Sequence, residues 1–208
     1  MNAKCIYVAG VLLLAAGMSW SAEKAVEAPS AKPKFENVEK ATLPCIVYAN
    51  VDDKDKRLWA PSGWMGSVDF IEFDEGCKDN PHSGSSCIKM TFTDPKTWGG
   101  VVWQNPAENW GDEPGGMDLN GAKQLVIWAR GEEGGEKVSL KLGGSGRDKP
   151  YYNTAEVGRE NVHLSKDWKR YTLPLGGKNL SRIISGFVFA VEGKGTNTIV
   201  YLDDIQYE

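Results

Sequence analysis

Hydrophobic and polar residues alternate along much of the chain. In residues 86–93 the side chains of Ile88, Met90 and Phe92 fall on one face, opposite mostly polar side chains. Residues 137–142 alternate between polar and aliphatic side chains throughout. Because successive side chains of a β-strand point to opposite faces, each segment predicts a strand with one buried and one solvated face. Strands of this kind are typical of an antiparallel sheet.

Other segments have the composition of strands with a less regular alternation. Residues 125–129 are apolar on both faces, which predicts a central strand. Glycine-rich turns separate many of the candidate strands, and only residues 180–184 predict a short helical turn. Together the segments predict an all-β fold, an antiparallel β-sandwich of jelly-roll type. Further strands are predicted at residues 45–51, 68–73, 101–104, 168–173, 184–191 and 198–207.

The first 43 residues differ in composition from the rest. Lys4 precedes an almost unbroken apolar run at residues 6–16, the layout of a secretory signal peptide, which we assign to residues 1–21. The run is too short for a membrane span, which needs about 20 apolar residues. Residues 22–43 are rich in Ala, Pro, Lys and Glu and predict a flexible linker. The sequence therefore predicts a secreted, periplasmic or cell-surface protein without a membrane span, whose folded domain covers residues 44–208.

The net charge of the chain argues against some classes of binding partner. Its 208 residues contain 24 Lys and Arg and 28 Asp and Glu, a net charge of −4. Without a surplus of basic residues, we expect neither nucleic acid nor an anionic membrane as a partner. Two His leave little material for a histidine-rich metal site, whereas 24 Gly and 8 Trp fit a β fold with many turns and abundant indole.

Three cysteines remain after the predicted signal peptide. Cys77 and Cys87 flank a turn-rich stretch, so they are the favoured disulfide pair. Such a short loop would contribute about 2–3 kcal/mol, chiefly by restricting the unfolded chain. Cys45 lies in an apolar segment, which favours a buried free thiol, although a pairing of Cys45 with either of the others stays open.

Catalytic motifs are weak in this sequence. Glu72 and Asp74 share one strand face, as the acids of jelly-roll glycoside hydrolases do, but the pattern breaks at Gly76. His82 and His163 lack a nucleophile-elbow sequence nearby. The glycine-rich residues 143–147 lack the Lys-Ser/Thr ending of a phosphate loop and predict a turn. We therefore expect that the protein is not an enzyme.

Tryptophans in polar turns are the most informative residues for function. Residues 98–111 hold Trp98, Trp103 and Trp110 among Gly, Asn, Gln and Glu, and Trp64 lies in a similar turn upstream. A flat apolar ring covers the C–H face of a pyranose, while neighbouring amides and acids bond its hydroxyls. These four indoles are candidate stacking rings for a sugar, whereas Trp128 and Trp168 are expected in the core. Candidate partners for the sugar hydroxyls are Gln104, Arg130 and Tyr151.

Several segments together resemble a known family. The residues from 44 to 208 are similar to the β-jelly-roll carbohydrate-binding modules of the galactose-binding-domain-like superfamily. The matching segments are residues 61–66 (PSGWMG), 82–90 (HSGSSCIKM), 125–131 (LVIWARG), 168–171 (WKRY) and 200–205 (VYLDDI).

The resemblance implies a module without catalysis that holds a polysaccharide on a sheet face or in edge loops. It also implies a structural calcium near the last strand, where Asp203 and Asp204 match the acidic position of the family. Calcium takes six to eight oxygen ligands, so backbone carbonyls and Asp52 or Asp53 would complete the site. Modules of this kind often accompany a glycan-degrading enzyme, which makes such an enzyme a candidate partner.

Three functions follow from these observations. The leading hypothesis is a secreted, non-catalytic protein that binds a polysaccharide or oligosaccharide through exposed Trp residues. The first alternative is a cell-surface structural or interaction protein on the same fold, with the Trp side chains buried. The second is a jelly-roll glycan hydrolase or lyase that uses Glu72, Asp74 or Glu75.

Overall fold

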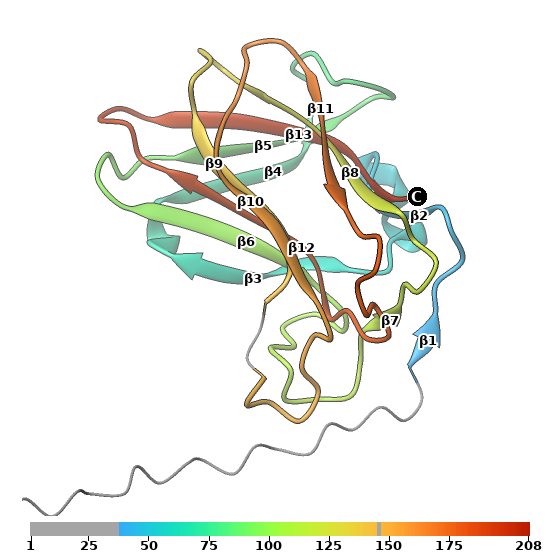
Figure 1. Cartoon of the computed structure of the whole chain (residues 1–208). Helices are drawn as coiled ribbons and strands as arrows, with labels where there is room; N and C mark the ends of the chain where they lie inside the picture. Colours follow the sequence, from blue (N-terminus) through green and yellow to red (C-terminus); the bar gives the residue numbers. More distant parts are fainter. Residues whose placement is uncertain (1–37, 145–146) are drawn as a thin grey trace, which may run out of the picture.

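Two antiparallel sheets packed face to face make up the fold. The computed structural model describes residues 38–144 and 147–208, and Figure 1 shows the sheets as two layers. The five-stranded sheet has the order β10 (Glu156–His163), β9 (Lys137–Gly143), β12 (Ser185–Glu192), β6 (Trp98–Gln104), β3 (Ala60–Gly66). The six-stranded sheet has the order β11 (Lys169–Pro174), β8 (Gln124–Gly131), β13 (Thr198–Tyr207), β5 (Cys87–Phe92), β4 (Ile71–Cys77), with β2 (Cys45–Tyr48) paired to β13. The predicted all-β sandwich is confirmed.

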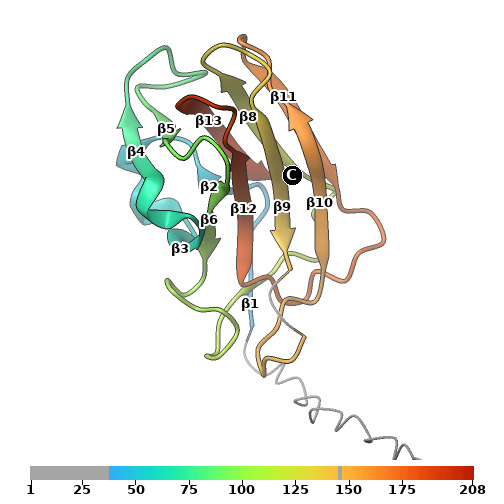
Figure 2. The same ribbon diagram turned by 90° about the vertical axis from the view of Figure 1, so that its left-hand side faces the viewer.

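Short elements complete the description. Strands β1 (Glu39–Lys40) and β7 (Met117–Asp118) form a small parallel pair. Two 3₁₀ turns, η1 (Val51–Lys56) and η2 (Val68–Phe70), lie between strands, and η2 leads from β3 into β4. In Figure 2 the edge strands β10 and β11 lie together on one side of the sandwich, and β3 and β4 lie on the other.

The core follows from the alternation in the sequence. Ile88, Met90 and Phe92 are fully buried, as predicted. They pack in one cluster with inward side chains of the five-stranded sheet, including Trp103 and Phe187, whose ring centroids are 5.1 Å apart. Each such side chain stabilises the fold by about 1.5–3 kcal/mol relative to its exposed state.

The two strands of the sandwich that the sequence did not predict, β3 and β10, are the edge strands of the five-stranded sheet. Strand β3 contains Pro61 and Gly63, which are rare inside a paired strand but tolerated at an edge. Strand β10 is mostly polar and exposed, and its pairing with β9 is interrupted by a bulge between Arg159 and Val162. Both therefore lack the hydrophobic alternation that identifies strands with a buried face.

Two predictions near loops and the N-terminus need correction. Residues 180–184 form no helical turn; instead Ile183 forms a β-bridge to Met117. The predicted linker ends too late, because Glu39 and Lys40 already pair with β7. The predicted signal peptide, residues 1–21, and the first part of the linker lie outside the described residues.

The cysteines are free thiols in this structure. The predicted Cys77–Cys87 disulfide is wrong here, although the two residues lie opposite each other in β4 and β5. The two thiols share a hydrogen bond, and each also contacts the backbone of Asp79. The Asp79 N–H donates to Cys77 Sγ at 3.4 Å, and Cys87 Sγ lies 4.0 Å from the Asp79 carbonyl oxygen. Cys45 is a buried thiol as predicted, and burial raises its pKa to about 11.

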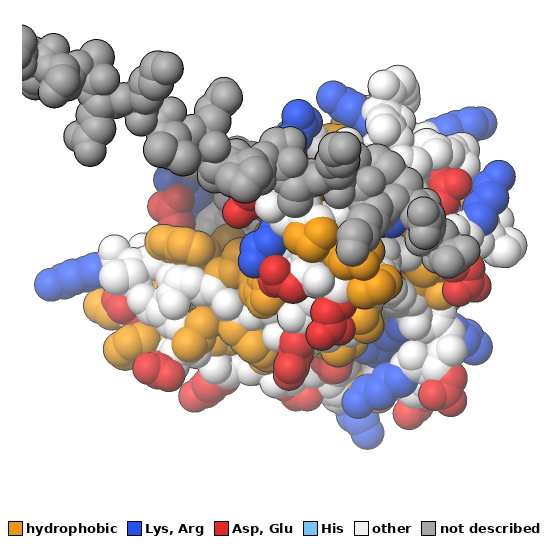
Figure 3. Space-filling view, turned by 90° about the horizontal axis from the view of Figure 1, so that it is seen from below, with side chains coloured by type: hydrophobic (Ala, Val, Ile, Leu, Met, Phe, Trp, Pro, Cys, Tyr) orange, Lys and Arg blue, Asp and Glu red, His pale blue; other side chains and the backbone are white. Residues whose placement is uncertain are grey.

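A membrane span is not found among the described residues, since no helix there has the length and apolar composition to cross a bilayer. The end of the molecule seen from below in Figure 3 combines hydrophobic side chains in the middle with acidic and basic side chains around them. This end carries the long loops that follow β6 and β9 (Figure 1).

A buried ion pair joins the two turns that connect the sheets at the other end. Glu136, fully buried, precedes β9, and its Oε1 accepts hydrogen bonds from Lys194 Nζ at 2.8 Å and from the Glu133 N–H at 3.0 Å. Burial alone would raise the pKa of Glu136, but these two donors outweigh it and the pKa is lowered. Gly131 makes room for this carboxylate, since a Cβ there would lie 1.6 Å from Oε2.

We expect Glu136→Gln to lower the free energy of unfolding by about 2 kcal/mol, because a charge-assisted hydrogen bond is lost and Lys194 is left without its counterion. Urea unfolding at pH 7 measures the change. Glu160→Gln, which breaks an exposed ion pair with Lys141, is the control and has a much smaller effect. The wild-type advantage declines as the pH falls through the lowered pKa of Glu136. Equal losses in the two variants would contradict the prediction.

Candidate functional site

A groove of about 720 Å³ lies on the outer face of the five-stranded sheet. Its floor comes from side chains that alternate with the core residues of the same strands. Val188 of β12 pairs with Val102 of β6 on one side and with Lys141 of β9 on the other. One row along, Ala190 pairs with Gly100 and with Ser139. The side chains of the floor are therefore mostly small and apolar.

The small floor residues are required by the close packing of the strands. At Gly100 a Cβ would lie 2.6 Å from the carbonyl oxygen of Phe189 and 3.1 Å from Met65 Cε. Glycine at this position lets the Met65 side chain lie across the strand and line the groove. The volume of the groove is within the range typical of ligand clefts.

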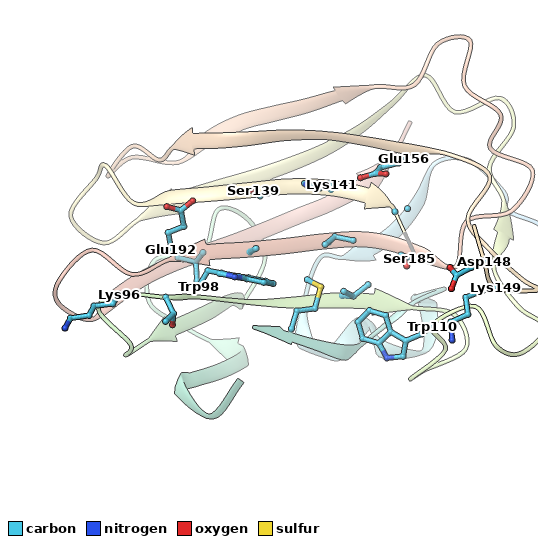
Figure 4. Close-up of a pocket in the computed structure, with 18 residues that line it drawn as sticks. Lys96, Trp98, Trp110, Ser139, Lys141, Asp148, Lys149, Glu156, Ser185 and Glu192 are labelled. Atoms are coloured by element: carbon cyan, nitrogen blue, oxygen red, sulfur yellow. The ribbon is translucent and has the colours of Figure 1, made fainter. Parts of the chain in front are cut away.

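Two indole rings stand at opposite ends of the groove, Trp98 at the start of β6 and Trp110 on the loop that follows β6 (Figure 4). Their exposed fractions are 46% and 36%. Trp110 packs against Gly63, where a Cβ would lie 2.9 Å from its Cζ2. Since Gly63 pairs with Val102, the span from Trp98 to Val102 separates the two ends by about 13 Å along the strand. A ligand that touched both rings would be an oligomer.

Polar side chains surround the rings, and three of the six charged ones, Lys141, Lys149 and Glu192, form ion pairs. Near Trp110, Lys149 Nζ lies 2.7 Å from Asp112 Oδ1. Near Trp98, Glu192 pairs with Lys137 at 2.9 Å. The groove wall therefore offers hydrogen-bonding groups in a nearly charge-balanced setting. The remaining polar lining residues include Lys96, Thr97, Ser139, Lys141, Asp148, Glu156 and Ser185 (Figure 4).

Of the four indoles predicted to stack, the structure brings together only Trp98 and Trp110. Trp103 is fully buried in the core, because it alternates with Val102 and points between the sheets. Trp64 is 42% exposed, but it points away from the groove and packs edge-on against Phe73 of the other sheet, with centroids 5.5 Å apart. The prediction of an exposed ring is therefore wrong for Trp103, whereas Trp64 is exposed as predicted but does not line the groove.

The predicted hydroxyl partners also lie elsewhere. Gln104 is adjacent to the groove but buried, with 1% of its surface exposed, so it cannot reach a ligand. Arg130 is on the outer face of the six-stranded sheet, over the Tyr201 ring at 3.6 Å from its centroid. Tyr151 does not line the groove, and its N–H donates to the Gly111 carbonyl next to Trp110.

Sequence reasoning missed the groove floor. One signal for it existed in residues 187–191 (FVFAV), where apolar side chains occupy both faces of β12. A strand with a fully solvated outer face would carry polar side chains at positions 188 and 190. The apolar outer face therefore marks the groove, although the sequence does not show which strands lie beside it.

The β4–β5 loop covers part of the outer face of the other sheet. The His82 ring stacks on Trp128 with centroids 3.7 Å apart, and Trp168 Nε1 donates to the Asn80 carbonyl at 2.9 Å. Trp128 is half-buried beneath this loop and outside the core, which corrects its prediction. Trp168 is also half-buried, but it packs against the small buried cluster of Cys77, Cys87 and Tyr201. Arg130 Nη2 also donates to the loop, at the Asp79 carbonyl.

The predicted metal position has hydrogen-bond donors around it. Asp203, fully buried, accepts from the backbone N–H groups of His82, Ser83 and Asp204 at 2.8–3.2 Å. Asp204 contacts His82 Nδ1 at 2.6 Å and accepts from Ser83 Oγ at 2.9 Å. Asp53 instead pairs with Lys56. Among the described residues no group of three or more His, Cys, Asp or Glu could hold a metal ion.

Calcium needs oxygen ligands that are free to turn towards it, so these contacts fit a hydrogen-bonded turn better than a calcium site at Asp203 and Asp204. Calcium binding stays a prediction. A lower melting temperature in the presence of a chelator would support it, and identical unfolding curves would contradict it.

The three candidate catalytic acids lie on β4, at the edge of the six-stranded sheet, and none of them lines the groove. Glu72 is exposed. Asp74 Oδ1 accepts a hydrogen bond from the Gly76 N–H, and Glu75 forms an ion pair with Arg57. These contacts give the acids structural partners.

Comparisons with known proteins place the fold. No family model matches the sequence, and no curated protein matches it. Among solved structures, a family 30 carbohydrate-binding module is 15% identical, with a TM-score of 0.55, covering 80% of this chain and 99% of the module. The protein has the fold of β-sandwich carbohydrate-binding modules. This confirms the resemblance inferred from the sequence at the level of the fold.

Other similar structures share less geometry with this chain. A family 61 module in complex with β-1,4-galactotriose is 18% identical, with a TM-score of 0.41, covering 72% of this chain and 87% of the module. The glycoside hydrolase domain of Endo-D from Streptococcus pneumoniae is 16% identical, with a TM-score of 0.48, and only 21% of that chain is covered.

We expect Asp203 to make stability depend on pH. Burial raises the pKa of Asp203 to about 6, despite three backbone donors, whereas an unfolded Asp titrates near 3.9. The folded state therefore binds the proton more tightly, and this contribution to stability, on the order of 2–3 kcal/mol, is lost as the pH rises from about 4 to about 6.

Asp203→Asn removes this titration at nearly constant size. The difference in unfolding free energy between wild type and variant, measured in urea at several pH values, should therefore change across this window. Acids that do not interact with Asp203 titrate equally in both proteins and cancel in the difference, whereas the neighbouring Asp204 interacts with Asp203 and contributes to it. Parallel curves from pH 4 to pH 7 would show that Asp203 does not titrate as expected.

Proposed function

We propose that the protein binds a polysaccharide or oligosaccharide, without catalysis, in the groove of the five-stranded sheet. The observation that carries the proposal is the pair of exposed indoles, Trp98 and Trp110, at the two ends of one groove. The alternative of a structural protein with buried Trp side chains is not favoured, because these two rings are open to solvent.

The chemistry of the lining supports a sugar ligand. An indole ring covers the apolar face of a pyranose and removes both from water. Between the rings, the half-buried floor residues Val188 and Ala190 provide an apolar surface, while Ser139 and Lys141 offer groups for hydroxyls. A chain lying along the groove would touch Trp98 and Trp110 with different sugar units.

The proposal includes an exported location, which the signal-peptide pattern at residues 1–21 supports. It also includes cooperation with a glycan-degrading enzyme outside the cell, which follows from the resemblance of the sequence to carbohydrate-binding modules. Binding in the groove would then keep the protein on the glycan on which such an enzyme acts.

Trp98→Ala and Trp110→Ala test the proposal. Native gels that contain galactan, xylan, mannan or hydroxyethyl cellulose should retard the wild-type protein in at least one case. Each substitution should weaken that retardation by about ten-fold or more, because a stacked side chain contributes about 1.5–3 kcal/mol.

Trp64→Ala is the matched control, since Trp64 is equally exposed but lies outside the groove. The polysaccharide that retards the wild-type protein should retard Trp64→Ala to the same extent. No retardation of the wild-type protein by any polysaccharide, or equal losses in all three variants, would reject the groove as the site.

A further inference from the structure

The two indoles of the groove are held in different ways. Trp98 belongs to β6 and is fixed by the pairing of that strand, and its carbonyl accepts from the Ser67 N–H at 2.9 Å. Trp110 lies outside any strand, on the loop between β6 and β7. Its position therefore depends on how this loop is fastened to the sheet.

Gln104 connects the sheet to this loop. Its Nε2 donates to the Asn109 carbonyl at 2.9 Å, and its Oε1 accepts from Ser62 Oγ at 2.9 Å. The same Ser62 hydroxyl accepts from the Glu108 N–H at 2.8 Å. The loop is thus bonded at the two residues that precede Trp110, from β6 and from β3.

The Asn109 side chain then shapes the turn around Trp110. Its Oδ1 accepts from the N–H of Gly111 at 2.8 Å and from that of Glu113 at 3.3 Å, and its Nδ2 donates to the Glu113 carbonyl at 3.0 Å. Gly111 has a φ of +96°, a backbone conformation that favours glycine. These bonds enclose Trp110 between two fixed residues.

We infer that Gln104, with Ser62 and Asn109, forms a positioning network that holds the Trp110 ring in its binding orientation. This inference rests on the proposed function. Gln104 is 1% exposed and Asn109 is 4% exposed, so neither contacts a ligand in the groove. The network keeps the loop ordered before a ligand binds. Binding therefore does not lose free energy to the ordering of the loop.

Gly63 is the fourth part of this arrangement. A Cβ there would lie 2.8 Å from Gln104 Oε1 and 2.9 Å from Trp110 Cζ2. The absence of a side chain lets Gln104 and the indole ring both lie against β3. A substitution at this glycine must move one or the other.

The experiment compares Gln104→Met with wild type. Methionine has nearly the same length but cannot bond Ser62 or Asn109. In protein labelled with 5-fluorotryptophan, the resonance of Trp110, assigned with Trp110→Phe, should shift or broaden without any ligand, whereas that of Trp98 stays unchanged. Retardation by the polysaccharide that retards wild type in the native gels should weaken by about three- to ten-fold.

Two comparisons separate positioning from a general structural effect. Ser86→Ala removes a buried acceptor of the Val51 N–H next to the other sheet and should leave both readouts at the wild-type values. In the Trp110→Ala background, Gln104→Met should cause no further loss of binding, because its effect passes through the missing ring. If Gln104→Met does not fold, Ser62→Ala removes one end of the network and is measured in its place.

An unchanged Trp110 resonance with unchanged retardation would overturn the inference, and so would a full additional loss in the Trp110→Ala background. The proposed function fails separately, when no polysaccharide retards the wild-type protein. The fluorine resonances report on the network even in that case, because they need no ligand.

Discussion

The alternation of side chains along the strands of the five-stranded sheet determines both the core and the groove. In β6, Val101 and Trp103 point into the sandwich, so Val102 must point outward. In β12 the same rule turns Phe187 and Phe189 inward and Val188 outward. A shift of one residue in the register would exchange the two sets. The burial that stabilises the fold therefore also fixes the floor on which a ligand would lie.

Whether an indole of the groove lies on a strand or on a loop determines how firmly it is held. Trp98 shares the backbone ladder of β6 and keeps its place as long as the sheet is folded. Trp110 depends on side-chain bonds from Gln104 and Asn109, which replace the missing ladder. A site built from one strand residue and one loop residue thus needs buried polar groups that never meet the ligand.

The sequence was sufficient for the strands that have one buried face. It also singled out Trp98 and Trp110, which are exposed and line the groove, while their role in binding stays a prediction. It was insufficient where contacts between segments far apart in the sequence determine whether a side chain is buried and what it bonds to. Gln104 looks like a ligand-binding amide in the sequence, yet Ser62, far away in the chain, pairs with it and buries it. The thiols of Cys77 and Cys87 likewise contact the Asp79 backbone, which spacing alone does not reveal.

The outer face of the six-stranded sheet shows why exposed tryptophan on a strand is not enough for a site. Trp128 points outward from β8, as Trp98 does from β6. However, the His82 ring covers Trp128, and Asp203 and Asp204 bond the backbone and side chains of that same loop. The buried carboxylate of Asp203 is thus part of what closes this face. The five-stranded sheet has its loops at its ends instead, which leaves its apolar floor open between Trp98 and Trp110.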